Sequence, residues 1–132
     1  MEIPEDLRYT KDHEWARLDK AKKIVTVGVT DYAQEKMGDV VYVELPDEGD
    51  DVTQAEPFGS VESVKAVSDL FAPISGVVEE VNDTLMDTPE AVNDDPYNEA
   101  WMIKVKVHDP ADLEDLMTAE EYKQYLSAEE EA

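Results

Sequence analysis

Short apolar segments separated by polar turns run along most of this chain. Residues 101–107 alternate strictly, with Trp101, Ile103 and Val105 on one face, which indicates a strand with one buried side. Other segments are nearly continuous runs of β-branched and aromatic residues, which also favour strands. The predicted strands cover residues 9–18, 24–29, 39–45, 57–64, 66–74, 77–81 and 101–107.

Helical spacing is confined to shorter stretches. Residues 31–37 follow Thr30, a favourable N-cap, and precede Gly38, a typical helix terminator. The polar stretch 82–98 is rich in turn dipeptides and predicts one helical turn near residues 89–92. The predicted helices of this part of the chain are therefore short and peripheral.

The order of these elements predicts a single domain covering residues 1–132, a size that suits one modest core. An arm covers residues 1–8, a β core covers about 9–108, and a helical segment covers about 110–128. Within that segment, Thr118 and Glu121 have the spacing of a capping box. Many short antiparallel strands with Gly and Pro at the turns predict a mainly β protein, a flattened barrel or sandwich.

One lysine stands between two of the predicted strands. Residues 57–64 and 66–74 are predicted to form a hairpin with Lys65 at or near its tip. Because the tip lacks an Asn-Gly or Asp-Gly pair, we expect a type I turn slightly wider than a tight two-residue one. A solvated surface lysine is the commonest interpretation of such a residue. An exposed amine on a stiff hairpin is, however, also well placed for covalent attachment of a carrier group.

The charge of the chain is strongly negative. It has 11 Lys and Arg residues against 34 Asp and Glu residues, a formal net charge of −23. No basic stripe is present to neutralise phosphates, which excludes nucleic-acid binding. Such a surface repels itself in dilute buffer and is screened by concentrated salt, so we expect a saline habitat. The alternative is an acidic protein that docks onto basic partners.

Several kinds of chemistry are excluded by composition and spacing. The chain has no cysteine, and its two histidines lack ligand-type spacing, so we expect no metal site and no disulfide. Neither a Gly-x-Ser-x-Gly elbow nor a glycine-rich phosphate loop is present, and we expect no catalytic residue. No apolar run is long enough to span a membrane, and no targeting segment is evident. We therefore expect a soluble, cytoplasmic protein of a prokaryote.

Six short segments, taken together and in order, resemble the H proteins of the glycine cleavage system, which are lipoyl carriers. The resemblance extends over about residues 9–126. A biotin carrier would typically have methionine beside its lysine, whereas Val64 and Ala66 flank this one. The segments that carry the resemblance are residues 13–15, 27–34, 38–46, 58–66, 73–76 and 92–97.

The resemblance implies a lipoyl-domain-like fold in which Lys65 carries lipoate through an amide bond. It further implies recognition by a lipoylating enzyme, either a lipoate ligase or a lipoyl or octanoyl transferase. In lipoyl carriers these enzymes are sensitive to an acidic residue three positions before the lysine and a glycine eleven positions after it. The matching residues here are Glu62 and Gly76.

The resemblance also implies a non-catalytic role in a multienzyme system. The carrier would shuttle the aminomethyl group of glycine from a pyridoxal-phosphate glycine decarboxylase (P protein) to a tetrahydrofolate-dependent aminomethyltransferase (T protein). It would then pass electrons to dihydrolipoamide dehydrogenase (L protein). A surface cleft near His13, Glu14 and Asp69 would protect the loaded arm; the alternative is that these residues only pack or face solvent.

Three other functions are open to the same sequence. The first is a relay protein that supplies lipoate to other complexes. The second is an unmodified acidic binding module, in which Lys65 is only a surface residue. The third is an enzyme that uses Lys65 as an amine nucleophile, against which stands the lack of a base, an oxyanion donor or an apolar pocket around the lysine.

Overall fold

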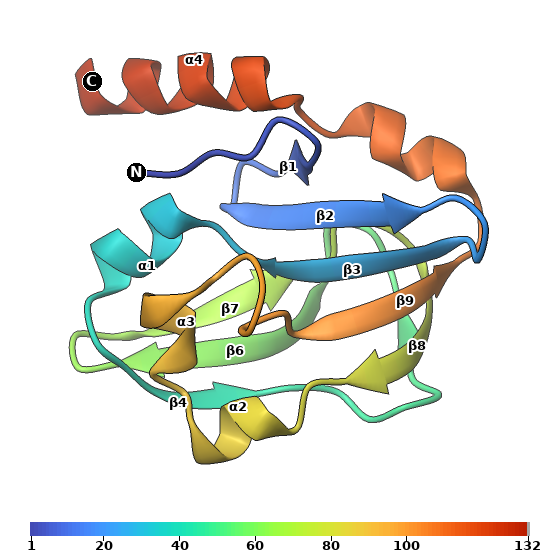
Figure 1. The fold of residues 1–132 in the computed structure, drawn as a ribbon, viewed down its shortest axis with the longest axis horizontal. Coiled ribbons are helices and arrows are strands. Elements are labelled where there is room, and N and C mark those ends of the chain that lie inside the picture. The colour runs from blue at the N-terminus through green and yellow to red at the C-terminus, as the bar shows by residue number, and fades with distance from the viewer. Residues whose placement is uncertain (132) are drawn as a thin grey trace.

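The computed structural model describes residues 1–131, and their side chains as far as Glu129. Two antiparallel sheets dominate it (Figure 1). The larger sheet has six strands in the order β1-β2-β3-β9-β8-β5, and the smaller has three in the order β4-β6-β7. The strands of the larger sheet are β1 Arg8–Tyr9, β2 Glu14–Asp19, β3 Ile24–Val29, β9 Ile103–Val107, β8 Gly76–Val81 and β5 Asp51–Val52. Those of the smaller sheet are β4 Val40–Glu44, β6 Pro57–Ser63 and β7 Val67–Phe71. The predicted mainly β fold is confirmed, as two open sheets and not a closed barrel.

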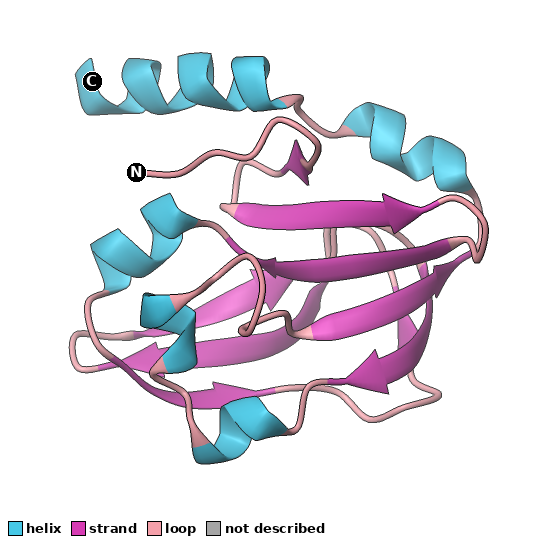
Figure 2. Ribbon diagram, in the orientation of Figure 1, coloured by secondary structure: helices cyan, strands magenta, loops and turns pink. Residues whose placement is uncertain are grey.

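The helices lie at the periphery of the two sheets (Figure 2). They are α1 Asp31–Met37, α2 Thr84–Asp87, α3 Ala91–Asp94, the 3₁₀ helix η1 Pro110–Asp115 and α4 Ala119–Glu131. The single helical turn predicted near residues 89–92 is wrong in detail, because two short helices occupy the stretch. Within residues 1–131, none of the helices combines the length and apolar character that crossing a membrane requires.

Helix α1 begins and ends where its sequence predicts. The Thr30 side chain accepts a hydrogen bond from the N–H of Ala33 at 3.2 Å, as an N-cap does. At the other end, the N–H of Gly38 donates to the carbonyl of Gln34, and Gly38 has a φ of 76°. Only glycine adopts this conformation readily, so the helix ends there. The capping box of α4 is also present, since Thr118 and Glu121 exchange hydrogen bonds of 2.9 and 3.2 Å.

The strand predicted over residues 9–18 is wrong, because the chain breaks into β1 and β2. Thr10 causes the break: its Oγ1 accepts hydrogen bonds from the N–H groups of Asp12 and Glu14 at 3.2 and 3.1 Å. His13 then takes a φ of 69°, outside the extended region. The resulting turn changes the direction of the backbone, and a new strand begins at Glu14. No sequence pattern predicts the two-residue strand β5, which pairs with β8.

The core lies between the two sheets, and a second apolar cluster lies under α4. The first cluster includes Val27, Val43 and Ile103, each fully buried. The second is aromatic: the rings of Tyr9 and Tyr122 stack with centroids 4.6 Å apart. Burying one such side chain stabilises the fold by roughly 1.5–3 kcal/mol. Helix α4 is thereby fixed over the N-terminal strands (Figure 1).

Candidate functional site

Strands β6 and β7 form the predicted hairpin, and Lys65 lies in its turn. Regular pairing ends at Glu62 opposite Val67, and residues 63–66 connect the two strands. The N–H of Ser63 donates to the carbonyl of Ala66 at 2.8 Å. The Ser63 hydroxyl oxygen in turn accepts hydrogen bonds from the N–H groups of Lys65 and Ala66 at 3.2 and 3.3 Å. The Ser63 side chain therefore stabilises a turn that lacks the Asn-Gly pair typical of tight hairpins.

The turn is fastened to the loop that follows α1. The N–H of Val64 donates to the carbonyl of Asp39 at 3.0 Å. The methylene chain of Lys65 lies over Gly38, since a Cβ atom there would be 3.5 Å from the lysine Cε and 3.9 Å from its Nζ. Lys65 itself is exposed, and among the side chains that the structure describes it belongs to no ion pair. The lysine is thus held at its base and accessible at its amine.

Asn93 supports this loop from α3. Its side-chain amide donates to the carbonyl of Gly38 at 2.9 Å, and its Oδ1 accepts from the N–H of Val40 at 2.9 Å. A third bond runs from the amide to Oε1 of Gln34 at 3.2 Å. One side chain therefore bonds both sides of the loop on which the lysine turn is fastened. In the sequence, Asn93 stands only within the segment 92–97 that carries the family resemblance, and no local signal there predicts this role.

A cleft of about 300 Å³ begins at the end of α1 and extends to the start of β2. The three residues predicted for the arm cleft, His13, Glu14 and Asp69, all line it. Lys36 and Met37 of α1 line it too, and they directly precede the glycine against which Lys65 lies. The cleft and the lysine are therefore neighbours. The remaining lining residues are Asp12, Val29, Tyr32, Ala33, Ser68 and Leu70.

Glu14 is the buried acid of this site, with a side chain only 1% exposed. The Thr10 hydroxyl donates to its Oε1 at 2.6 Å, and the N–H of Phe71 donates to its Oε2 at 3.2 Å. Burial raises the pKa of Glu14 from its ordinary 4.5 to about 8, although both hydrogen bonds act in the opposite direction. Near neutral pH this carboxyl can therefore hold or release a proton.

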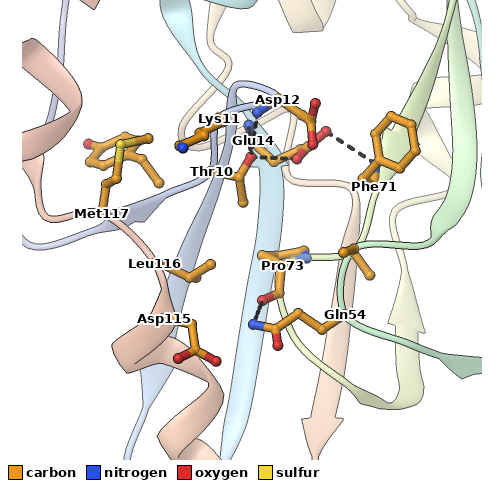
Figure 3. A pocket seen from close by; sticks show the side chains of 13 residues that line it. Thr10, Lys11, Asp12, Glu14, Gln54, Phe71, Pro73, Asp115, Leu116 and Met117 are labelled. Atoms are coloured by element: carbon orange, nitrogen blue, oxygen red, sulfur yellow. Dashed lines mark hydrogen bonds between the residues drawn. The ribbon is translucent and has the colours of Figure 1, made fainter. Parts of the chain in front are cut away.

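Glu14 also lines a second pocket, of about 290 Å³ (Figure 3). Figure 3 shows Glu14 between Thr10 and Phe71, with Gln54 donating to the carbonyl of Pro73 at 3.0 Å. Glu14 thus lines both the cleft and the second pocket. Both lie where the edge of the smaller sheet meets the larger sheet. Nothing in the sequence analysis predicted the second pocket, because its walls come from segments far apart in the chain.

His13 is held by the C-terminal helix. Its Nδ1 is 2.9 Å from the hydroxyl of Tyr122, and its Nε2 is 3.6 Å from a carboxylate oxygen of Glu129. Burial lowers the pKa of His13, while Glu129 and then Asp12 act in the opposite direction. The ring also packs against Tyr32, with centroids 4.7 Å apart. The orientation of this cleft residue therefore depends on α4.

The two residues predicted to matter for lipoylating enzymes occupy different sheets. Glu62 is exposed on β6 of the smaller sheet, close to the turn. Gly76 is buried at the start of β8, where a Cβ atom would lie 2.2 Å from the carbonyl oxygen of Lys106. Close backbone packing accounts for the glycine. The structure therefore brings Glu62 near Lys65 and gives Gly76 a packing role.

A two-sheet β fold that presents one exposed lysine on a hairpin turn belongs to the lipoyl-domain class of carriers. The glycine cleavage H-protein family model matches residues 7–129. A glycine cleavage system H protein of Anaeromyxobacter sp. (strain K) is 61% identical over 130 residues, which cover 98% of this chain and 100% of that protein. One from Staphylococcus carnosus (strain TM300) is 52% identical over 126 residues, covering 96% of this chain and 98% of that protein.

A solved structure gives the same result. The crystal structure of a glycine cleavage system H protein from Mycobacterium marinum matches with a TM-score of 0.88 and 40% identity, covering 95% of this chain and 99% of that chain. The chain belongs to the glycine cleavage H-protein family. Members of this family are lipoyl carriers, non-catalytic components of the glycine cleavage system. The family resemblance seen in the sequence is thereby confirmed.

Proposed function

We propose that this chain carries lipoate in amide linkage to Nζ of Lys65 and serves the glycine cleavage system. In that role it moves the aminomethyl group of glycine from a glycine decarboxylase to an aminomethyltransferase, and electrons to dihydrolipoamide dehydrogenase. The observation that supports this best is the position of Lys65, an exposed amine on a braced turn beside a cleft. We further propose that residues 1–132 act as one domain, since α4 packs on the N-terminal strands.

The cleft suits an aliphatic chain that ends in a polar group. Apolar side chains of Val29, Met37 and Leu70 line it together with the polar side chains of His13 and Asp69. An arm attached at Lys65 would start beside α1, whose last turn borders the cleft. When bound, lipoate supplies a dithiolane that can be reduced and can accept the aminomethyl group.

The chain's own residues would bind that arm and keep water from it. In this proposal carboxyl oxygens of Glu14 and Asp69 accept hydrogen bonds from an amine, and His13 borders the same space. Glu14 can also exchange a proton near neutral pH, because burial raises its pKa to about 8. Glu62 would contact the lipoylating enzyme directly, whereas Gly76 would act only by keeping β8 packed.

Intact-mass measurement with peptide mapping tests the attachment site. Protein purified without its lipoyl group is incubated with lipoate, ATP and a lipoate ligase. We expect a mass increment of one lipoyl amide on the peptide that contains Lys65, and none in Lys65→Arg, which keeps the charge but lacks an acylatable amine. A wild-type chain that stays unmodified would contradict the proposal and favour an unmodified binding module.

A second measurement separates the carrier from the relay. Lipoylated protein is mixed with glycine decarboxylase and aminomethyltransferase. In parallel it is mixed with a lipoyl transferase and an unlipoylated domain of another lipoate-dependent complex, so that the acyl group can pass from the Lys65 amide to the acceptor lysine. We expect glycine-dependent turnover in the first mixture. Transfer of lipoate to the second acceptor, without turnover in the first, would replace glycine cleavage with the relay function.

A further inference from the structure

The hydroxyl of Tyr122 connects three parts of the protein beneath α4. It lies 2.9 Å from Nδ1 of His13 and 2.8 Å from Oγ1 of Thr30. Tyr122 and Thr30 are fully buried, so these hydroxyls are out of contact with bulk water. Thr30 Oγ1 also accepts the 3.2 Å bond from the N–H of Ala33 that caps α1. A continuous chain of hydrogen bonds therefore joins the start of α1, helix α4 and the histidine of the cleft.

The protons of this chain of bonds can be counted, because each hydroxyl has only one. With Nδ1 of His13 unprotonated, Thr30 donates to the Tyr122 oxygen and Tyr122 donates to Nδ1, so both hydroxyl protons have acceptors. With a proton on Nδ1, that N–H donates to Tyr122, and Tyr122 donates to Thr30, which already accepts from Ala33. The Thr30 proton then has no acceptor among the hydrogen bonds of the described side chains. A buried O–H without a partner is costly, so the arrangement with unprotonated Nδ1 is favoured.

We propose that Tyr122 is a positioning residue of the arm cleft, which holds His13 as the neutral tautomer that carries its proton on Nε2. The other ring nitrogen agrees with this assignment. Nε2 of His13 is 3.6 Å from a carboxylate oxygen of Glu129, which attracts an N–H at that position. Both ring nitrogens of the histidine therefore have partners on α4.

This chain of bonds opposes the positive charge that neighbouring carboxylates favour on His13. Burial lowers the pKa of His13, whereas the carboxylates of Glu129 and Asp12 raise it. Because a second proton must go on Nδ1, protonation reverses the bonds of Tyr122 and leaves the Thr30 proton without an acceptor. The chain of bonds therefore acts with burial to keep the ring neutral. The other titratable side chains that pack against the ring or line the cleft with it are Glu14, Tyr32, Lys36, Asp69 and Tyr125.

A neutral His13 affects what the cleft can hold. This consequence rests on the proposed function, in which Glu14 and Asp69 bind the amine of an aminomethyl group. An imidazolium in the same cleft would repel that amine in its ammonium form and would compete for the same carboxyl oxygens. Tyr122 thereby helps to retain the loaded arm indirectly, because it bonds His13 and does not itself line the cleft.

Long-range proton–nitrogen NMR of the unlipoylated chain reads the tautomer directly. The sequence has only two histidines, so the signals of His13 and His108 are easily separated. We expect His13 to show a protonated Nε2 and an unprotonated Nδ1 at neutral pH, whereas the exposed His108 should show signals averaged over both tautomers. A protonated Nδ1 of His13 at neutral pH would overturn the proposal without any substitution.

Tyr122→Phe tests the hydroxyl, because the ring and its stacking on Tyr9 are retained. We expect His13 to populate both tautomers in this variant. The midpoint of its titration should rise by about one pH unit, since the penalty for protonating Nδ1 is removed. Tyr42→Phe is the matched control: Tyr42 is 48% exposed on β4 of the smaller sheet, and loss of its hydroxyl should leave His13 unchanged. An unchanged tautomer and titration in Tyr122→Phe would show that the hydroxyl does not position the histidine.

The loaded arm provides a second readout. Each protein is lipoylated and loaded by glycine decarboxylase with glycine, and release of the aminomethyl group is followed at neutral pH. We expect release about fivefold faster from Tyr122→Phe than from wild type, and wild-type release from Tyr42→Phe. Equal release from all three proteins would overturn the role of Tyr122 in the cleft. If wild type is not lipoylated at Lys65, the proposed function fails, whereas NMR of the unlipoylated chain still decides whether Tyr122 fixes His13.

Discussion

The backbone N–H of Phe71 donates a hydrogen bond of 3.2 Å to Oε2 of Glu14. This bond joins the end of β7, at the edge of the smaller sheet, to the first residue of β2 in the larger sheet. A carboxyl group is thereby buried at the junction of the sheets, and its residue lines two pockets. Its protonation should therefore affect both the stability of the fold and the contents of the cleft.

Glu14→Gln should remove one pH dependence of stability. The folded chain holds the Glu14 proton up to a pKa of about 8, whereas the unfolded chain releases it near 4.5. The stabilising contribution of that proton is full below pH 4.5 and is lost as pH rises towards 8. We expect the free energy of unfolding of wild type to fall relative to Glu14→Gln by up to ~1.4 kcal/mol per pH unit in this window.

Denaturant unfolding of the two proteins across that pH range checks this prediction. The pKa of His13 is lowered in the fold, so this residue contributes a pH dependence of stability with the opposite sign. Both proteins contain His13, so its contribution cancels when their free energies of unfolding are subtracted. Parallel stability curves for wild type and Glu14→Gln would contradict the burial argument.

Asn93→Ala should loosen the loop under Lys65. Three hydrogen bonds are lost, and the N–H of Val40 and the carbonyl of Gly38 lose their partner. We expect the free energy of unfolding to drop by about 1–3 kcal/mol, with faster hydrogen exchange at Val40. Asn98→Ala is the control, since Asn98 is exposed and bonds only Asp95 nearby; a change within ~0.5 kcal/mol is expected there. If the two substitutions lowered the free energy of unfolding equally, Asn93 would not be a specific support of the loop.

Gly76→Ala should destabilise the protein because of packing. The added Cβ would lie 2.2 Å from the carbonyl oxygen of Lys106, so β8 and β9 must move apart. We expect a loss of more than about 2 kcal/mol in thermal or denaturant unfolding. Gly49→Ala is the control, because Gly49 has open space around it but a φ of 92°, and it should lose only about 1 kcal/mol.

The same Gly76 variant tests how this glycine affects lipoylation. If Gly76→Ala is stable yet acylated slowly, the glycine is recognised by the enzyme and the packing explanation is wrong. If acylation falls only as far as the folded fraction does, packing is sufficient.

Salt should stabilise this protein more than an ordinary one. The formal net charge is −23, and the structure describes only two side-chain ion pairs within residues 1–129. Self-repulsion should therefore dominate in dilute buffer and be screened as the Debye length falls to about 3 Å at 1 M. We expect the unfolding midpoint to rise between dilute buffer and molar KCl. A midpoint that does not move would remove the argument for a saline habitat.

Local features were predicted well where a few neighbouring residues decide them. Residues 24–29 form β3 and residues 31–37 form α1 with the predicted bounds, because β-branched side chains and caps act within a few positions. The predicted strand over 9–18 failed because the Thr10 side chain competes for the backbone and starts a turn. Propensity alone does not register that competition.

The amino-acid sequence by itself determined the family, the hairpin and the position of its one exposed lysine. These follow from residue types at short and regular spacings, which local conformational preference records. The tertiary structure alone decided that Glu14, one of 34 acids, is buried against Phe71 with a raised pKa, and that Asn93 supports the lysine loop. The cleft that the resemblance implied near His13, Glu14 and Asp69 takes its volume and its other lining residues from the tertiary structure. Desolvation and hydrogen bonding depend on segments that meet only after folding, and no local pattern encodes them.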